Sequence, residues 1–291
     1  MAETGEQIGG YKLRSLLQTG SVSQVFEVVE PHSHRHFAMK VLLPESAHKA
    51  ETRNALFHEA EVGTKLRHDN VIHILKINRD PDNPHFIMEF FPSGSLRTRI
   101  MNKNFDFLKE HNAKIFKQSA TGLAYMHAHQ WIHRDVKPDN FLVNALGELK
   151  IIDFAISQKV PTGFARWFWR KKGKAQGTPS YMAPEQIQGG MPDRRSDIYS
   201  LGATWYELLT GRPPFRGASY SDLLNKHIAT RADNPQVHNK DVGDEIAALI
   251  LRMLAKKPEQ RPKDCHEILF ALKGIRLYKS LSAAKPGEEE A

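Results

Sequence analysis

The sequence predicts an α+β fold in two lobes, a small β-rich N-terminal lobe and a larger helical C-terminal lobe. Two observations carry this prediction. Residues 11–91 contain short β-rich segments separated by turn residues, which is the pattern of neighbouring strands. From about residue 100, apolar residues recur at intervals of three or four, which places them on one face of a helix. The two patterns meet near residues 89–95, where we expect the lobes to join.

The small lobe is expected to contain strands on both sides of a single helix. The helix is predicted over residues 56–66, because the apolar residues there have helical spacing. Segments of alternating or β-rich character, bounded by turn residues, predict the strands. These segments are residues 11–17, 24–29, 36–42, 71–77 and 85–91.

The large lobe is expected to be helical throughout. The apolar face of one helix is predicted from the spacing of Phe116, Ala120, Leu123 and Met126. Residues 197–209 are apolar on nearly all sides, so this helix should run through the interior of the lobe. Residues 246–255 are predicted to form a further helix that faces the core, because Arg252 interrupts the apolar run.

The composition is that of a globular protein with a large core. Of the 291 residues, 40% are apolar and 25% are charged, which is ordinary for a folded domain. The single cysteine, Cys265, excludes a disulfide framework and a cysteine-based zinc site. The N-terminus has no signal pattern, and no apolar run approaches the roughly 20 residues of a membrane span. We therefore expect a cytoplasmic protein.

The strongest functional signal comes from two polar segments in the second half of the chain. Residues 133–140 read His-Arg-Asp-Val-Lys-Pro-Asp-Asn, and residues 153–155 read Asp-Phe-Ala. The apolar residues at 141–143 and 149–152 predict a hairpin that joins these two segments. A charged surface loop is the alternative interpretation, but the combined pattern has too many fixed positions for it.

With these segments the sequence resembles the eukaryotic-like serine/threonine protein kinase family of the bacterial type, over nearly the whole chain. The resemblance implies the two-lobed protein kinase fold, with a small antiparallel β-rich N-lobe that carries one helix and a larger helical C-lobe. The implied domain covers residues 11–281, with the N-lobe at about 11–88, the hinge at about 89–95 and the C-lobe at about 96–281. Residues 1–10 and 282–291 are then expected to be flexible termini.

The resemblance implies ATP-dependent transfer of the γ-phosphoryl group to serine or threonine hydroxyls of protein substrates. Such a transfer depends on positioning and on neutralisation of charge. Asp135 would orient the substrate hydroxyl and accept its proton, and Lys137 would follow the γ-phosphate. Asn140 and Asp153 would bind Mg²⁺, which accepts amide and carboxylate oxygens beside phosphate and water. Lys137, with Thr178 downstream, is typical of the serine/threonine form.

The phosphates of ATP are expected to meet Lys40, which closes a predicted strand and would hold the α- and β-phosphates. In the family, this lysine pairs with an acidic residue on the following helix, and Glu59 is the matching candidate. Glu61 is the rival candidate. Two helical residues at this spacing point about 200° apart, so only one of the two can face Lys40.

The adenine is expected to bind at residues 88–91, Met-Glu-Phe-Phe, which should form the hinge. Backbone groups of Glu89 and Phe91 would contact the adenine, with Met88 at the back of the pocket. The apolar residues expected to sandwich the ring are Val25, Ala38 and Leu142. Core packing is an alternative role for these apolar residues, and the two roles are compatible.

Later segments agree with the resemblance. Residues 177–185 are similar to the family's substrate-docking segment, which disfavours a small-molecule phosphotransferase of related fold. Arg261 is expected to be the buried partner of Glu185. Asp197 is expected to hold the backbone at residues 133–134 by hydrogen bonds. We assign structural rather than catalytic roles to these three residues.

Two segments depart from the family's pattern. The loop over the phosphates keeps only Gly20 of the expected glycines, and Gln18 and Ser23 should stiffen it and weaken ATP binding. Ala155 replaces the usual glycine after Asp-Phe, which would cost about 1 kcal/mol if that residue needed a positive φ. These departures motivate an alternative function, an ATP-binding pseudokinase or scaffold with little transferase activity.

Residues 160–176 form the most individual part of the sequence. Aromatic and basic residues are interleaved between Phe164 and Lys174 with no acid among them, and Thr162 is the only hydroxyl residue. One hypothesis is that the segment orders itself by packing, or docks on an acidic protein or an anionic membrane surface. The other is a mobile loop whose aromatic residues lie against the large lobe. No nucleic-acid partner is expected, and the oligomeric state is left open.

Overall fold

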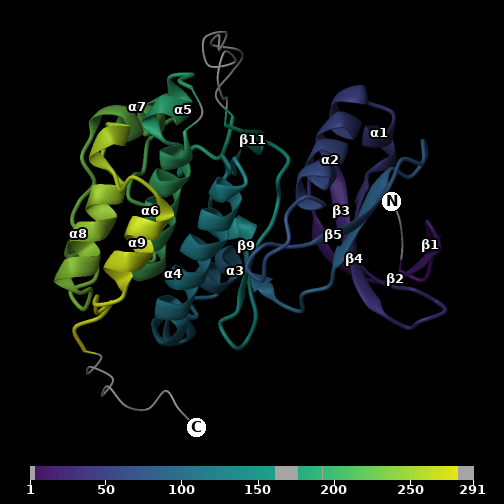
Figure 1. Ribbon diagram of the computed structural model, residues 1–291, viewed down its shortest axis with the longest axis horizontal. Coiled ribbons are helices and arrows are strands. Elements are labelled where there is room, and N and C mark those ends of the chain that lie inside the picture. The colour runs from purple at the N-terminus through teal and green to yellow at the C-terminus, as the bar shows by residue number, and fades with distance from the viewer. Residues whose placement is uncertain (1–3, 161–175, 192, 281–291) are drawn as a thin grey trace.

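The N-terminal lobe is built on one antiparallel sheet (Figure 1). The computed structural model describes residues 4–160, 176–191 and 193–280. Its largest sheet has the strand order β1-β2-β3-β4-β6-β5, and every neighbouring pair is antiparallel. The strands are β1 (Gln7–Ile8), β2 (Tyr11–Thr19), β3 (Ser23–Val29), β4 (His36–Leu42), β5 (Ile74–Asn78) and β6 (His85–Glu89).

Alternate residues of this sheet point into a small apolar core. Phe26 and Val28 of β3, and Met39 and Val41 of β4, are each fully or almost fully buried there. β4 has the predicted bounds, while β2 and β3 differ from the prediction only at one end. β6 ends at Glu89, earlier than predicted, because the chain leaves the sheet there to form the hinge.

Two helices accompany the sheet, where the sequence prediction had one. Helix α2 (Ala50–Gly63) buries Leu56, Phe57 and Ala60 against the sheet and the C-lobe core. It begins before the predicted residue 56, because its first turn is polar and gives no apolar signal. The short helix α1 (Pro44–Ala47) precedes it and was missed, since a single turn shows no periodicity.

The segment before residue 11 is in part ordered, contrary to the prediction. Residues 1–10 were predicted to be a flexible terminus, yet Gln7 and Ile8 pair with β2 as strand β1. Ile8 is buried in the small apolar core. The turn between the two strands uses Gly9 and Gly10, both with positive φ (59° and 86°), a conformation that glycine adopts without steric cost.

A hairpin of the C-lobe connects the two lobes. β9 (Phe141–Val143) and β10 (Leu149–Ile151) form the predicted hairpin, and β7 (Gly94–Ser95) pairs with β9. The Ile151 N–H donates to the Asn70 carbonyl, and the Ile151 carbonyl accepts from the Ile72 N–H, each at 2.9 Å. Because residues 70–72 bond to the hairpin, β5 begins at Ile74 instead of the predicted residue 71.

Helix α6 (Arg194–Thr210) runs through the interior of the C-lobe as predicted, with every residue from Ser196 to Leu209 buried. The predicted apolar face of α4 (Phe105–Ala128) is also buried, and the rings of Phe116 and Trp205 stack with their centroids 4.2 Å apart. Among the described residues, the other helices of this lobe are α3 (Leu96–Met101), α5 (Pro184–Ile187), α7 (Tyr220–Ala229), α8 (Asp244–Met253) and α9 (Cys265–Leu272) (Figure 1). Within the described ranges, none of the helices is both long enough and apolar enough to cross a membrane.

Candidate active site

One buried carboxylate holds the start of segment 133–140, which follows strand β8 (Trp131–Ile132). Asp197 of α6 is fully buried, and its two oxygens accept from the backbone N–H groups of His133 and Arg134, each at 2.8 Å. His127 Nε2 lies 2.8 Å from the same carboxylate. Arg134 has a φ of 69°, which is unfavourable for a residue with a side chain. The hydrogen bonds to Asp197 therefore stabilise a strained turn, and the role predicted for this residue is confirmed.

The carboxylate of Asp135 accepts hydrogen bonds from three neighbours. Lys137 Nζ lies 2.6 Å from Oδ2, and the Asn140 side-chain amide donates to Oδ2 at 3.2 Å and to the Asp135 carbonyl at 2.8 Å. The Thr178 N–H and hydroxyl donate to Oδ1 at 3.0 and 2.9 Å. Lys137 also donates to the Thr178 hydroxyl at 2.7 Å. The docking segment therefore contacts segment 133–140 through a hydroxyl placed between a carboxylate and an ammonium group.

Asp153 is a second carboxylate of the site. Burial raises its pKa, but the nearby Lys40 ammonium, His133 and the Ala155 N–H together hold the pKa below its ordinary value. The next residue, Phe154, is fully buried and meets the His133 ring edge-on, with the centroids 5.9 Å apart. The side chains of segments 133–140 and 153–155 thus pack against each other. The low pKa of Asp153 means that its carboxylate is ionised.

Lys40 of β4 and Glu59 of α2 form the predicted ion pair, with 2.6 Å between Nζ and Oε2. Glu61, the rival candidate, turns to the other side of the helix and pairs with Arg79 at 2.7 Å. Burial disfavours the Lys40 ammonium, but the carboxylates of Glu59 and Asp153 hold the pKa of Lys40 above its ordinary value. The side chain of Lys40 is therefore charged and directed at the two acids.

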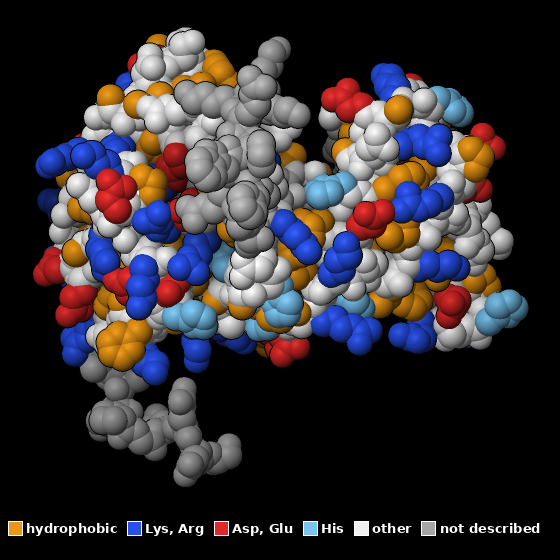
Figure 2. Space-filling view, turned by 45° about the horizontal axis from the view of Figure 1, so that its top comes forward, with side chains coloured by type: hydrophobic (Ala, Val, Ile, Leu, Met, Phe, Trp, Pro, Cys, Tyr) orange, Lys and Arg blue, Asp and Glu red, His pale blue; other side chains and the backbone are white. Residues whose placement is uncertain are grey.

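Two adjoining cavities lie between the lobes. Figure 2 shows a notch between the two lobes at the top of the face it displays. The cavity at the hinge measures about 490 Å³, and it is lined by all the residues predicted to surround adenine: Val25, Ala38, Met88, Glu89, Phe91 and Leu142. The inner cavity measures about 280 Å³, and its lining includes Lys40, Glu59, Asn140 and Asp153. Val25, Met88 and Ile152 line both cavities, so one elongated ligand could occupy both.

Sequence reasoning missed three apolar residues of the hinge cavity, namely Leu17, Ile72 and Ile152, and two polar ones, Thr98 and Asp139. An apolar residue in a strand does not reveal which of several apolar surfaces it contacts, so Leu17 and Ile72 gave no usable signal. Ile152 was open to prediction, since it directly precedes Asp153 and lies at the end of the predicted hairpin.

The two departures from the expected pattern have different structural outcomes. The cost predicted for Ala155 does not arise: Asp153, with φ 68°, has the left-handed conformation, and Ala155 is not among the described residues with positive φ. In the loop over the inner cavity, the Gly20 N–H donates to the Ser23 carbonyl at 2.8 Å and closes a tight turn. Gln18 and Ser23 both line the inner cavity, so their effect on ligand binding stays a prediction.

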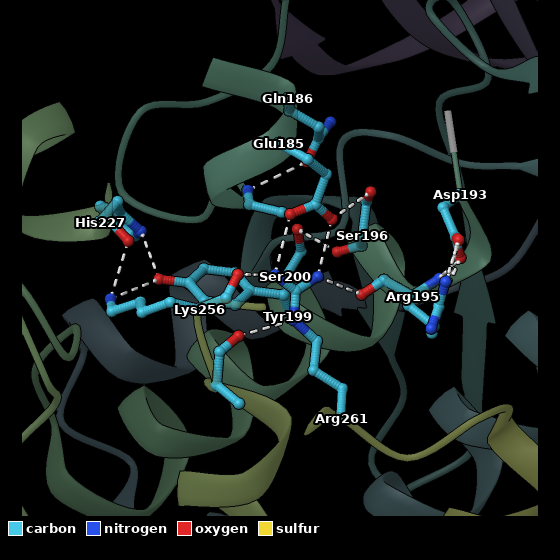
Figure 3. A network of polar contacts seen from close by, with 12 residues as sticks. Glu185, Gln186, Asp193, Arg195, Ser196, Tyr199, Ser200, His227, Lys256 and Arg261 are labelled. Atoms are coloured by element: carbon cyan, nitrogen blue, oxygen red, sulfur yellow. Dashed lines mark hydrogen bonds and ion pairs between the residues drawn. The ribbon is translucent and has the colours of Figure 1, made fainter. Parts of the chain in front are cut away.

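The docking segment is fixed to the C-lobe by the predicted ion pair (Figure 3). The Arg261 guanidinium donates to both oxygens of Glu185, at 2.7 and 2.8 Å, and its side chain is fully buried. Ser196 of α6 donates to the same carboxylate at 2.6 Å. Bidentate pairing of this kind combines charge with fixed geometry, so the position of the docking segment is tied to α6 and to the segment before α9.

The Arg134 side chain has a partner within the chain. Its guanidinium donates to the side-chain oxygen of Gln158 at 3.0 Å, and β11 (Gln158–Lys159) pairs with β8. Thr162 and the aromatic–basic segment at 164–174 lie outside the described residues. The hypotheses about their partners stay predictions from the sequence.

The fold and the site together define the class of two-lobed kinases, in which a nucleotide-sized cavity lies between a β-rich lobe and a helical lobe. A family model described as the protein kinase domain matches residues 11–271. The chain belongs to this family, as its motifs predicted.

Curated relatives agree with this assignment. The chain is similar to serine/threonine-protein kinase PrkC of Bacillus subtilis, with 29% identity over 258 residues, covering 88% of this chain and 39% of PrkC. It is 33% identical over 263 residues to the DNA damage-responsive serine/threonine-protein kinase RqkA of Deinococcus radiodurans, covering 88% of this chain and 38% of RqkA. It is also 31% identical over 245 residues to Aurora kinase A-A of Xenopus laevis, covering 84% of this chain and 57% of the Aurora kinase. The chain thus spans about two fifths of the length of these bacterial relatives.

Proposed function

We propose that this chain transfers the γ-phosphoryl group of ATP to serine or threonine hydroxyls of protein substrates. The observation that carries the proposal is the hydroxyl of Thr178, which lies 2.9 Å from the Asp135 carboxylate and 2.7 Å from the Lys137 ammonium. A substrate hydroxyl in the same place would meet an acceptor for its proton and a cation for the phosphoryl oxygens. The names of the bacterial relatives support the serine/threonine type.

The two cavities between the lobes suit ATP. The hinge cavity offers apolar faces from Val25, Ala38 and Leu142 to a flat ring, with backbone groups at one edge. The inner cavity contains Lys40, whose ammonium can attract phosphate oxygens. Glu59 orients that ammonium from behind, because the pair is short and mostly buried.

The residues of the inner cavity also fit Mg²⁺. Asp153 is ionised, and the Asn140 amide nitrogen donates to Asp135, which leaves its amide oxygen as an acceptor. In the described ranges, no cluster of three or more His, Cys, Asp or Glu side chains is arranged to hold a metal alone. This agrees with Mg²⁺, which usually takes one or two carboxylates together with substrate phosphates. When bound, the ion would neutralise charge on those phosphates.

The pseudokinase alternative finds no support in the described part of the chain. Lys40, Asp135 and Asp153 are all present with their expected neighbours. The conformational cost once attached to Ala155 is absent. We therefore retain an active kinase as the single proposed function.

A transfer assay with an Asp135→Asn variant tests the proposal. Purified protein would be incubated with radiolabelled ATP, Mg²⁺ and a generic basic protein, and phosphoserine and phosphothreonine would be measured. Loss of the proton acceptor should lower the rate at least about 100-fold. Asp106→Asn, which changes an exposed aspartate at the start of α4, should retain the wild-type rate. Equal labelling by the wild type and Asp135→Asn would exclude the proposed function.

A further inference from the structure

Lys150 lies behind the hinge, in the middle of β10, and no role has been assigned to it above. Its Nζ is 2.9 Å from Glu89 Oε1 and 5.7 Å from the centroid of the Phe91 ring. Glu89 and Phe91 are the two residues whose backbone groups are proposed to meet adenine. One ammonium group therefore contacts the side chains of both.

The Glu89 carboxylate is held by a second donor as well. The His73 N–H donates to Oε1 at 2.8 Å, and the Glu89 N–H donates back to the His73 carbonyl at 3.0 Å. Oε1 thus accepts from a backbone amide and from an ammonium group, and hydrogen bonds to a charged acceptor are stronger than neutral ones. The last residue of β6 is consequently fixed on both its main chain and its side chain.

The backbone that carries Lys150 is also well fixed. Lys150 pairs with Leu142 across the hairpin, and its neighbour Ile151 bonds to residues 70 and 72 of the N-lobe linker. The Lys150 side chain is only 15% exposed, and Lys150 is not among the residues that line either cavity. The Lys150 ammonium can therefore act on a ligand through Glu89 and Phe91, the two cavity residues that it contacts.

We propose that Lys150 is a positioning residue for nucleotide recognition. It holds the side chains of Glu89 and Phe91, so that the hinge backbone presents its polar groups to adenine. The inference rests on the proposed function, since it concerns the same nucleotide site. The Lys150 ammonium lies 2.9 Å from Glu89 Oε1 and 5.7 Å from the centroid of the Phe91 ring, so one cation contacts both side chains. Fixing the hinge before binding reduces the ordering cost of binding.

Steady-state kinetics of Lys150→Met test this role, because methionine keeps much of the apolar volume and removes the charge. We expect the KM for MgATP and the Kd of a fluorescent ATP analogue to rise about three- to tenfold, with kcat within twofold of wild type. Lys150→Arg should restore most of the affinity, because it keeps a cation in reach. Lys76→Met, an exposed lysine on β5, is the matched control and should leave KM unchanged.

Glu89→Gln provides the second variant and keeps Lys150 in place. If the two residues act as one unit, Glu89→Gln and the double variant should raise KM as much as Lys150→Met alone. An unchanged KM in Lys150→Met, or a loss confined to kcat, would overturn the positioning role while wild-type binding of ATP persists. Absence of ATP binding by the wild type would overturn the proposed function itself.

Discussion

Two buried charged residues, Asp197 and Arg261, bind groups that lie far from them in the sequence. Asp197 supports the strained turn at Arg134, and Arg261 neutralises Glu185 beneath the docking segment. Both contacts were predicted from motif positions. Substitution of either residue should lower the stability of the folded protein, because each is a buried charged side chain with short contacts to its partners.

Arg261→Ala should lower the free energy of unfolding by about 3–5 kcal/mol, because it leaves the mostly buried Glu185 carboxylate without its counterion. Urea unfolding followed by tryptophan fluorescence would measure the loss. Arg194→Ala, at an exposed position of α6, should change the free energy by less than about 0.5 kcal/mol. Equal stability of the Arg261 and Arg194 variants would show that the pair contributes nothing.

At the scale of elements, the contact between α2 and β5 sets the position of Glu59. Gly63 lies one turn after Glu59 on α2, and a Cβ atom built there would come within 2.4 Å of Ile74 Cδ1 and 2.6 Å of Ile74 Cγ1. The helix approaches the sheet this closely because residue 63 has no side chain. Larger residues at this position should push α2 away and lengthen the Lys40–Glu59 pair.

Gly63→Ala should therefore destabilise the protein by about 1–3 kcal/mol, the usual cost of overpacking, and weaken ATP binding through Glu59. The measurements are urea unfolding and ATP titration. Ile74→Ala is also expected to destabilise, by about 2–5 kcal/mol, because it opens a cavity. In the double variant the two changes should compensate in part, so its loss should be smaller than the sum of the single losses. Strict additivity would contradict the proposed contact.

At the scale of the whole molecule, the hairpin β9–β10 links the hinge, the N-lobe linker and the catalytic segment. The ligand cavities lie where these parts meet, so a bound nucleotide would contact both lobes. Basic side chains are spread over both lobes on the face seen in Figure 2. The net charge of +8 is therefore no evidence for one dedicated basic surface on this face.

MgATP should stabilise the folded protein as a whole. At about 100 times its Kd, the ligand adds about 2.7 kcal/mol to the free energy of unfolding, which corresponds to a rise in Tm of several degrees. ATP with EDTA should give a smaller rise, since Asp153 then faces the phosphates without a cation. Differential scanning fluorimetry measures both. Identical shifts with and without Mg²⁺ would contradict the metal role proposed for Asp153 and Asn140.

Much of the site was predictable from the sequence because its polar residues lie close together along the chain, in short motifs. Asp135, Lys137 and Asn140 belong to one turn of chain, so local geometry alone brings them together. Lys40 was paired correctly with Glu59, the acid that matches the family's pattern. Glu61 could not share this role, because residues two apart on a helix point in nearly opposite directions. The short elements β1 and α1 escaped prediction, since neither has enough residues to show a period.

By itself the sequence determined the family, the two lobes, the interior helix α6 and the polar residues of the site, because periodicity and motif spacing are local properties. Only the tertiary structure decided that Asp153, and not Ala155, takes the left-handed conformation. It also decided that Gln158 meets Arg134 and that Lys150 meets Glu89. These contacts join strands and loops whose relative placement depends on packing across the whole domain, which no local pattern encodes.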